Sequence, residues 1–176
     1  MSFFNLVLSV LVIGATFFVF GQRAAAGQQA TGTIKLHSRS HYHGIWAAIT
    51  STLPALLILV ALGLGKDLLF QHWARDFFPP EVSGGNAVDR AIALAKISNV
   101  VAGIIFGEVE PWVQSAGEAW IRWESNTIVV ANILVLGISL TGGLLGYQRI
   151  SLGFRARNHV ERILTWMLIG SSTVAI

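Results

Sequence analysis

The chain contains no cysteine and very little charge, and both absences narrow what it can be. Without cysteine it forms no disulfide framework, offers no thiol nucleophile and holds no cysteine-ligated metal. Charged residues make up 12% of its 176 residues, about half the share found in soluble domains. So few charges do not cover the surface of a water-soluble globule of this size. The composition therefore indicates a membrane protein.

The abundant residues are apolar, and they fall into long uncharged runs at 3–20, 44–65 and 127–146. About 20 apolar residues in a helix cross the roughly 30 Å of a bilayer's hydrocarbon core. We predict an all-α integral membrane protein with complete transmembrane helices near 3–21, 44–65 and 127–146. Pro54 is tolerated in such a helix because neighbouring groups re-satisfy the freed carbonyl. Gly142 and Gly146 have the spacing that lets helices approach closely, although glycine is common in membrane helices anyway.

The first run has one alternative interpretation, a cleaved secretory signal peptide. The three alanines at 24–26 would offer a small-residue cleavage site. A signal peptide carries positive charge before its apolar core, whereas the first basic residue here, Arg23, follows the run. We therefore favour a retained membrane helix.

A fourth apolar run, 163–176, follows a dense group of arginines. As a helix it would be about 21 Å long, too short to span, and we expect a fourth transmembrane helix cut off within the membrane. The charged residues just before it are Arg149, Arg155, Arg157, Glu161 and Arg162. These arginines first indicate a topology anchor at the membrane surface. We expect in addition that at least one of Arg155 and Arg157 grips a partner's carboxylate; the alternative is a local pair of Glu161 with Arg157, four residues before it.

Loop charge predicts the orientation. Residues 22–43 hold Arg23, Lys35 and Arg39 with no acid, and residues 147–162 are similarly basic. Residues 66–126 carry five basic and eight acidic residues. Because basic loops flanking spans mark the cytoplasmic side, we predict that the N-terminus lies outside and that 66–126 faces the periplasm.

The outer segment 66–126 is expected to contain amphipathic helices. Asn86 and Asp89 suit a helix start, and apolar residues follow at helical spacing. After Pro111, three tryptophans recur before the third span, at Trp112, Trp120 and Trp123. Tryptophan favours the bilayer interface, so we expect these helices to rest on the membrane or on partner helices; a ligand-binding aromatic box is the alternative.

No catalytic, cofactor-binding or metal-binding residues are assigned from the sequence, and we expect neither an enzyme nor a nucleic-acid-binding protein. His37, His41 and His43 lie in a loop without a carboxylate, and Arg39 among them would repel a cation. We expect these histidines to hydrogen-bond lipid headgroups or backbone. Glu108 and Glu110 have no partner evident in the sequence. No apolar run contains the ionisable residue that marks a transport pathway.

Two segments resemble a known family. KLHSRSHYHGIWAAITSTLPALLILV, at 35–60, is similar to the opening of bacterial phosphate ABC-transporter permeases of the PstC type. YQRISLGFRARNHVERIL, at 147–164, resembles the basic junction that precedes the permease core in that family. Together they bracket the third span.

The resemblance implies the N-terminal part of the membrane permease subunit of an importer for inorganic phosphate, in the bacterial inner membrane. Residues 1–146 would form a membrane extension, 147–162 a basic cytoplasmic linker, and 163–176 the truncated start of the permease core. The implied partners are a second permease subunit, an ATPase dimer and a periplasmic phosphate-binding protein, besides the lipid bilayer. No transport residue is expected in this fragment, and no cofactor. The alternative is an accessory or assembly subunit that packs beside a larger membrane complex and transports nothing.

Overall fold

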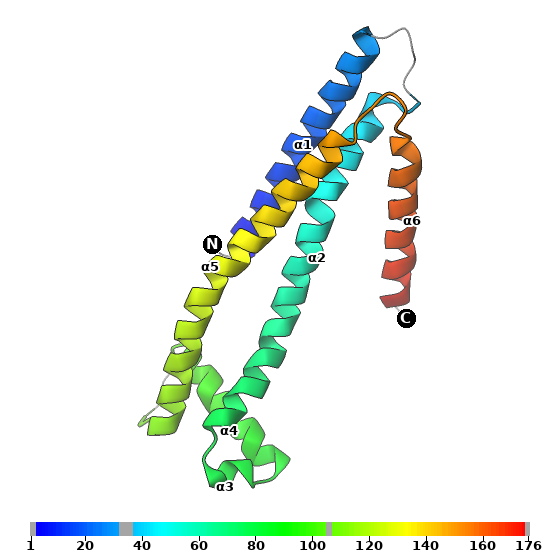
Figure 1. The fold of residues 1–176 in the computed structure, drawn as a ribbon. Helices are drawn as coiled ribbons and strands as arrows, with labels where there is room; N and C mark the ends of the chain where they lie inside the picture. Colours follow the sequence, from blue (N-terminus) through cyan, green and yellow to red (C-terminus); the bar gives the residue numbers. More distant parts are fainter. Residues whose placement is uncertain (1–2, 32–36, 105–106, 175–176) are drawn as a thin grey trace. The chain divides into compact units, whose positions relative to one another are not determined.

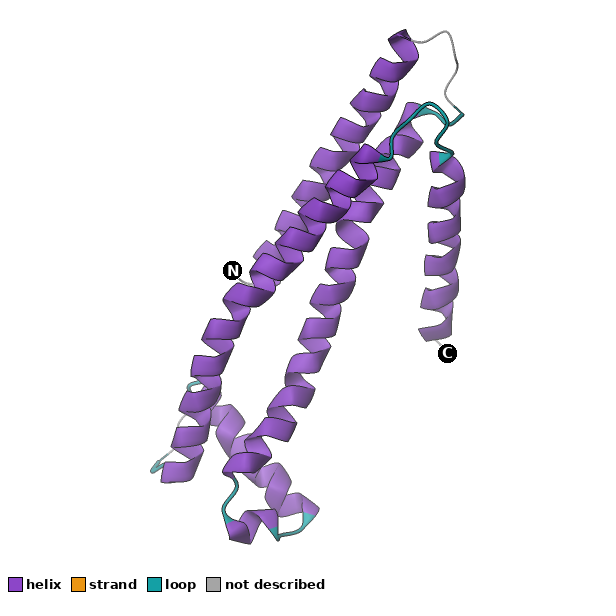
Figure 2. Cartoon of the chain, viewed as in Figure 1, coloured by secondary structure: helices purple, strands orange, loops and turns teal. Residues whose placement is uncertain are grey.

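A computed structural model describes residues 3–31, 37–104 and 107–174, and every regular element among them is helical (Figures 1 and 2). The elements are α1 (Phe3–Thr31), α2 (Ser40–Ala74), the 3₁₀ helix η1 (Arg75–Phe77), α3 (Pro80–Ser83), α4 (Ala87–Val101), α5 (Pro111–Gln148) and α6 (Ala156–Val174). The chain divides into two compact units: unit 1 comprises Met1–Leu59 and Asn132–Ile176, and unit 2 comprises Val60–Ala131.

Three helices are long and apolar enough to cross a membrane, at Phe3–Gln28, Ser40–Phe77 and Pro111–Gln148. They contain the three predicted spans, so the prediction of an all-α, multi-pass membrane protein is confirmed. The helices are nevertheless longer than the apolar runs. At 1.5 Å per residue, α2 and α5 each exceed about 50 Å, well beyond the roughly 30 Å of hydrocarbon. The α2 helix does not end at Lys66, where its apolar run stops, but continues to Ala74.

In unit 1, glycines allow α1, α2 and α5 to pack backbone against backbone. A Cβ added at Gly44 would lie 2.7 Å from the carbonyl oxygen of Phe18, and one at Gly21 would lie 2.9 Å from that of His43. A Cβ at Gly142 would overlap the carbonyl oxygen of Thr50, and one at Gly146 would overlap the Thr50 hydroxyl. Gly142 and Gly146 therefore do serve a close helix approach, which their spacing allowed but which the sequence left open.

The rest of this three-helix interface is apolar with one polar pair. Its buried cluster consists of Leu6, Val10, Ala55, Leu59 and Val135. The hydroxyl of Ser51 on α2 donates to the carbonyl oxygen of Ser139 on α5 at 2.9 Å, and the two hydroxyl oxygens lie 3.1 Å apart. Because both serines are buried, this bond gives α2 and α5 a fixed register along their shared face.

Unit 2 contains the predicted outer helices in modified form. The side chain of Asn86 accepts hydrogen bonds from the backbone of Val88 and Asp89, and Asp89 accepts from the backbone of Asn86, so α4 begins with the expected capping box. The second amphipathic stretch is not a separate helix. It is the N-terminal part of α5, which runs without a break from Pro111 into the third span.

The tryptophans of unit 2 form a packed core. Trp120 is only 3% exposed, and its ring lies 4.8 Å from Phe70 and 5.3 Å from Trp73, centroid to centroid. Trp120 therefore packs against other helical residues of unit 2 and holds the extension of α2 against α5. Lys66 and Glu124 add an ion pair of 2.5 Å between the same two helices within unit 2.

The fourth run also differs from the expectation. The α6 helix begins at Ala156, seven residues before the apolar run, so Arg157 and Arg162 lie on the helix and not in a linker. Only residues 149–155 connect α5 to α6. Figure 1 shows α6 beside the N-terminal half of α2, where Ala156 and Val160 pack around Trp46.

Candidate functional site

The two basic loops meet at one end of unit 1. The Gln28 side chain donates from Nε2 to the carbonyl oxygen of Ile150 at 3.3 Å. The backbone N–H of Arg157 donates to the Ser38 hydroxyl at 3.2 Å. We call residues 37–39 and 149–158 the basic junction. The loops that sequence analysis placed on one side of the membrane are thus in direct contact, although Lys35 of the first loop lies outside the described residues.

Ser38 caps the start of α6 from another part of the chain. The first N–H groups of any helix lack partners within the helix. Here the N–H of Arg157, the second residue of α6, finds its acceptor in the hydroxyl of Ser38, which is buried. A serine oxygen commonly plays this part from within its own helix. The bond makes the start of α6 depend on the loop before α2.

Arg157 is held by Glu161. Its Nε lies 2.6 Å from Glu161 Oε1, one helical turn along α6. The hydrogen bond to that carboxylate raises the pKa of the Arg157 guanidinium. The guanidinium carbon also lies 5.9 Å from the centre of the Tyr42 ring, within cation–π range. The local pair between Arg157 and Glu161, foreseen as an alternative, is therefore present.

Beside this pair lies a cavity of about 450 Å³. It is lined by His37, Ser38, Arg155, Arg157, Asn158 and Glu161. Arg155 is exposed and forms no ion pair with any residue that the structure describes. Arg155 and Asn158 therefore present unused hydrogen-bond donors to the cavity, which suit a carboxylate or phosphate group.

An aromatic cluster supports the junction. The rings of Phe154 and His159 stack at 5.1 Å with an angle of 14° between their planes. Trp46 lies 5.4 Å from Phe154 and 5.3 Å from His159, and His43 lies 5.9 Å from Phe154. Phe154, within the 149–155 connection, thus touches α2 and α6 together. This packing fixes the course of the short connection from α5 to α6.

The three histidines of the first loop have different environments. His43 is 0% exposed, and neither ring nitrogen finds a hydrogen-bond partner in the described part of the chain; the expectation of headgroup or backbone bonding is wrong for this residue. His41 is exposed and packs edge-on against Phe18 at 5.4 Å. His37 lines the junction cavity. Over residues 3–31, 37–104 and 107–174, no group of three or more metal-binding side chains comes together.

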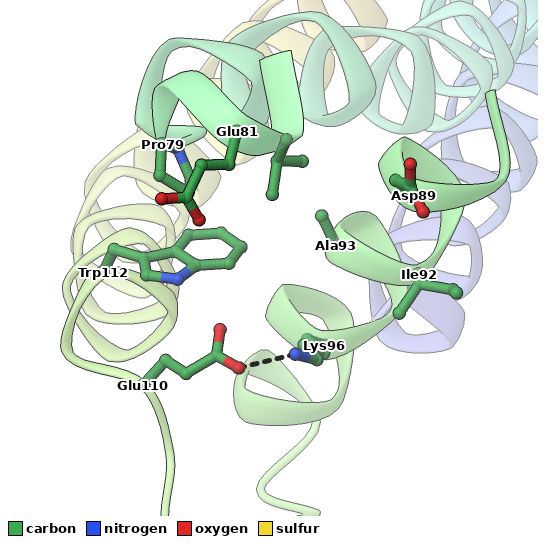
Figure 3. A pocket seen from close by; sticks show the side chains of 9 residues that line it. Pro79, Glu81, Asp89, Ile92, Ala93, Lys96, Glu110 and Trp112 are labelled. Atoms are coloured by element: carbon green, nitrogen blue, oxygen red, sulfur yellow. Dashed lines mark hydrogen bonds and ion pairs between the residues drawn. The ribbon is translucent and has the colours of Figure 1, made fainter. Parts of the chain in front are cut away.

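Unit 2 has its own cavity, of about 480 Å³, between α3, α4 and the start of α5 (Figure 3). Figure 3 shows the Lys96–Glu110 ion pair at its edge, with Nζ and Oε1 separated by 2.6 Å. The hydrogen bond from Lys96 lowers the pKa of Glu110, so Glu110 does have a defined partner, contrary to the sequence interpretation. Asp89 is occupied by the capping box of α4. Two of the three carboxylates of this cavity therefore serve the fold, and among the described residues Glu81 has neither an ion pair nor a part in a helix cap.

Comparison with protein families identifies the chain. A family model described as "Phosphate ATP-binding cassette transporter" (DUF3708) matches residues 7–176. The chain belongs to this family. The matched residues of this phosphate transporter family member include α2, α5, α6 and the basic junction. Searches of the curated proteins and of the solved structures each found no match.

Several residues that organise the site in this family member carry no signal in its sequence. No local sequence pattern marks Ser38 or Ser51, which the fold places beside Arg157 and Ser139. Phe154 gains its role only because the connection from α5 to α6 folds back onto Trp46. Sequence spacing did reveal Gly142, Gly146 and the Arg157–Glu161 pair, because each depends on positions within one helix.

Proposed function

We propose that this chain is the N-terminal part of the membrane permease subunit of an ABC importer for inorganic phosphate, in the bacterial inner membrane. The family match over residues 7–176 carries the proposal. The two segments that resemble PstC-type permeases, 35–60 and 147–164, agree with it. On this proposal the partners are a second permease subunit, an ATPase dimer and a periplasmic phosphate-binding protein.

Within such an importer, we assign this part of the chain a structural and docking role, neither catalytic nor transporting. Its three apolar runs contain no charged residue. A dehydrated phosphate needs clustered Arg or Lys side chains or helix N-termini to replace its water. The arginines gather instead at the basic junction, where Arg157 already holds Glu161. The glycine contacts and the Ser51–Ser139 bond support a compact three-helix module.

The docking role is assigned to Arg155. Arg157 is occupied by Glu161, whereas Arg155 has no ion pair among the described residues and lines the 450 Å³ cavity beside Asn158. A guanidinium grips a carboxylate through two parallel hydrogen bonds. We propose that a partner's Asp or Glu enters this cavity and pairs with Arg155.

A second candidate function is an accessory or assembly subunit of the same transporter. The observation that favours it is α6, whose side chains Trp166 and Leu168 are 68% and 72% exposed and offer an apolar surface to another membrane helix. The gene beyond Ile176 separates the two candidates: several further apolar spans would establish the permease, and a stop codon would establish the accessory subunit.

The experiment is gene deletion followed by uptake of radiolabelled phosphate from medium of low phosphate concentration. We expect the deletion to abolish high-affinity uptake and the intact gene to restore it. A gene encoding the double variant Gly142→Leu and Gly146→Leu, which forces α5 away from α2, should fail to restore uptake. Unchanged uptake in the deletion strain would overturn the proposed function.

A further inference from the structure

Unit 1 contains an apolar groove between α2, α5 and the start of α6. Its volume is about 370 Å³. The walls are formed by Ile49 and Leu53 of α2, Leu145 of α5 and Ile163 of α6, and Arg149 also lines it, just beyond the end of α5. The hydrocarbon walls suit the acyl chains of a phospholipid, and the guanidinium suits its phosphate.

The groove follows from the glycine packing. Because Gly142 and Gly146 have no side chain, α5 lies directly on the backbone of α2 at Thr50, and no bulky residue fills the space beside that contact. The α6 helix packs on α2 near Trp46 through Ala156, Val160 and Ile163. These contacts support both sides of the groove, so it does not depend on a single side-chain conformation.

Arg149 has no counter-ion within unit 1. The only acidic residue in 1–59 and 132–176 is Glu161, and that carboxylate is held by Arg157 at 2.6 Å. Arg149 is exposed and forms no ion pair with the residues that the structure describes. A permanent cation at an apolar groove, with no free carboxylate in unit 1, is suited to bind an anion.

We propose that this groove binds one anionic phospholipid, with its phosphate on Arg149 and an acyl chain along Leu53 and Leu145. Guanidinium groups bind phosphate bidentately, and basic pockets between membrane helices take anionic headgroups. Free inorganic phosphate would leave the apolar walls uncovered.

The test uses the full chain in nanodiscs of phosphatidylcholine with a minority of phosphatidylglycerol, released into native mass spectrometry. The wild-type protein should retain one phosphatidylglycerol in preference to phosphatidylcholine. Arg149→Gln should reduce that preference about fivefold, the effect of one arginine at the lipid surface. Arg39→Gln is the matched control, because Arg39 is exposed at the same end of unit 1 but does not line the groove; it should retain the wild-type preference.

A second variant tests the acyl-chain part of the site. Leu145→Trp fills the groove from an exposed position on α5, and should release both lipids while leaving the melting temperature unchanged. Equal loss in Arg39→Gln and Arg149→Gln would overturn the proposal, since it would show only diffuse attraction to anionic lipid. Displacement of the retained lipid by millimolar inorganic phosphate, or cross-linking of Leu145→Cys to a second copy of the chain, would also overturn it.

Discussion

The carbonyl oxygen of Thr50 on α2 lies against the backbone of Gly142 on α5, so closely that a Cβ at Gly142 would overlap it. Thr50 is four residues before Pro54, which has no N–H to donate to this carbonyl. Cα–H groups commonly contact carbonyl oxygens where helices pack closely. Gly142 therefore both allows the helices to approach and covers the acceptor that the proline leaves free.

Gly142→Ala should destabilise the three-helix packing, since the new methyl group has no space. Overpacking of this kind costs about 1–3 kcal/mol. The control is Gly137→Ala on the same helix, where nothing lies within 4 Å of an added Cβ; it should be neutral or stabilising by up to about 1 kcal/mol. Thermal unfolding in detergent measures both. Equal melting temperatures for the two variants would show that Gly142 is not in close contact.

The Ser51–Ser139 hydrogen bond should contribute modestly to stability, and replacing Ser51 should cost more than replacing Ser139. Ser51→Ala removes the hydroxyl that donates to the Ser139 carbonyl, at a cost of about 0.6 kcal/mol for a typical bond between membrane helices. Ser139→Ala leaves that carbonyl in place and should cost less. Thermal unfolding of the two single variants measures which of them loses more stability. A larger loss for Ser139→Ala would contradict the assigned donor and acceptor.

Periodicity and composition predicted the helices but not their limits. Uncharged runs located the spans, because a bilayer selects for apolar length. They did not show that α2 continues past Lys66 or that α5 begins at Pro111, since these extensions are held by tertiary contacts such as Trp73–Trp120 and Lys66–Glu124. At the basic junction, the charge was evident from the sequence. The Ser38–Arg157 contact joins segments far apart in the chain, and no local pattern encodes it.

The orientation predicted from loop charge can be tested at exposed serines on the two predicted sides of the membrane. Ser38 is buried and unsuitable for labelling, whereas Ser83 in unit 2 and Ser151 in the basic junction are exposed. Because the chain has no native cysteine, single cysteines at these positions are read without background. An impermeant thiol reagent added to intact cells should label Ser83→Cys and not Ser151→Cys. The reverse pattern would invert the topology.

Replacement of Arg155 by lysine and replacement of Arg157 by lysine should affect partner binding differently. Lysine cannot reproduce a bidentate grip on a carboxylate, so Arg155→Lys should weaken capture of the partner subunits about tenfold, the loss expected when one charged hydrogen bond disappears. Arg157→Lys keeps a cation beside Glu161 and should change capture little. Titration of the purified partner against each variant gives its affinity relative to the wild type. Equal affinities for Arg155→Lys and the wild type would leave Arg155 as a headgroup anchor only.

The most direct test of the proposed function is affinity purification of the tagged full-length gene product from membranes of phosphate-starved cells, with identification of the proteins that accompany it. The account predicts stoichiometric recovery of an ABC-type ATPase and a second permease subunit, with both reduced by Arg155→Lys. Purification of the tagged protein without either subunit, from cells that contain both, would contradict membership of the importer.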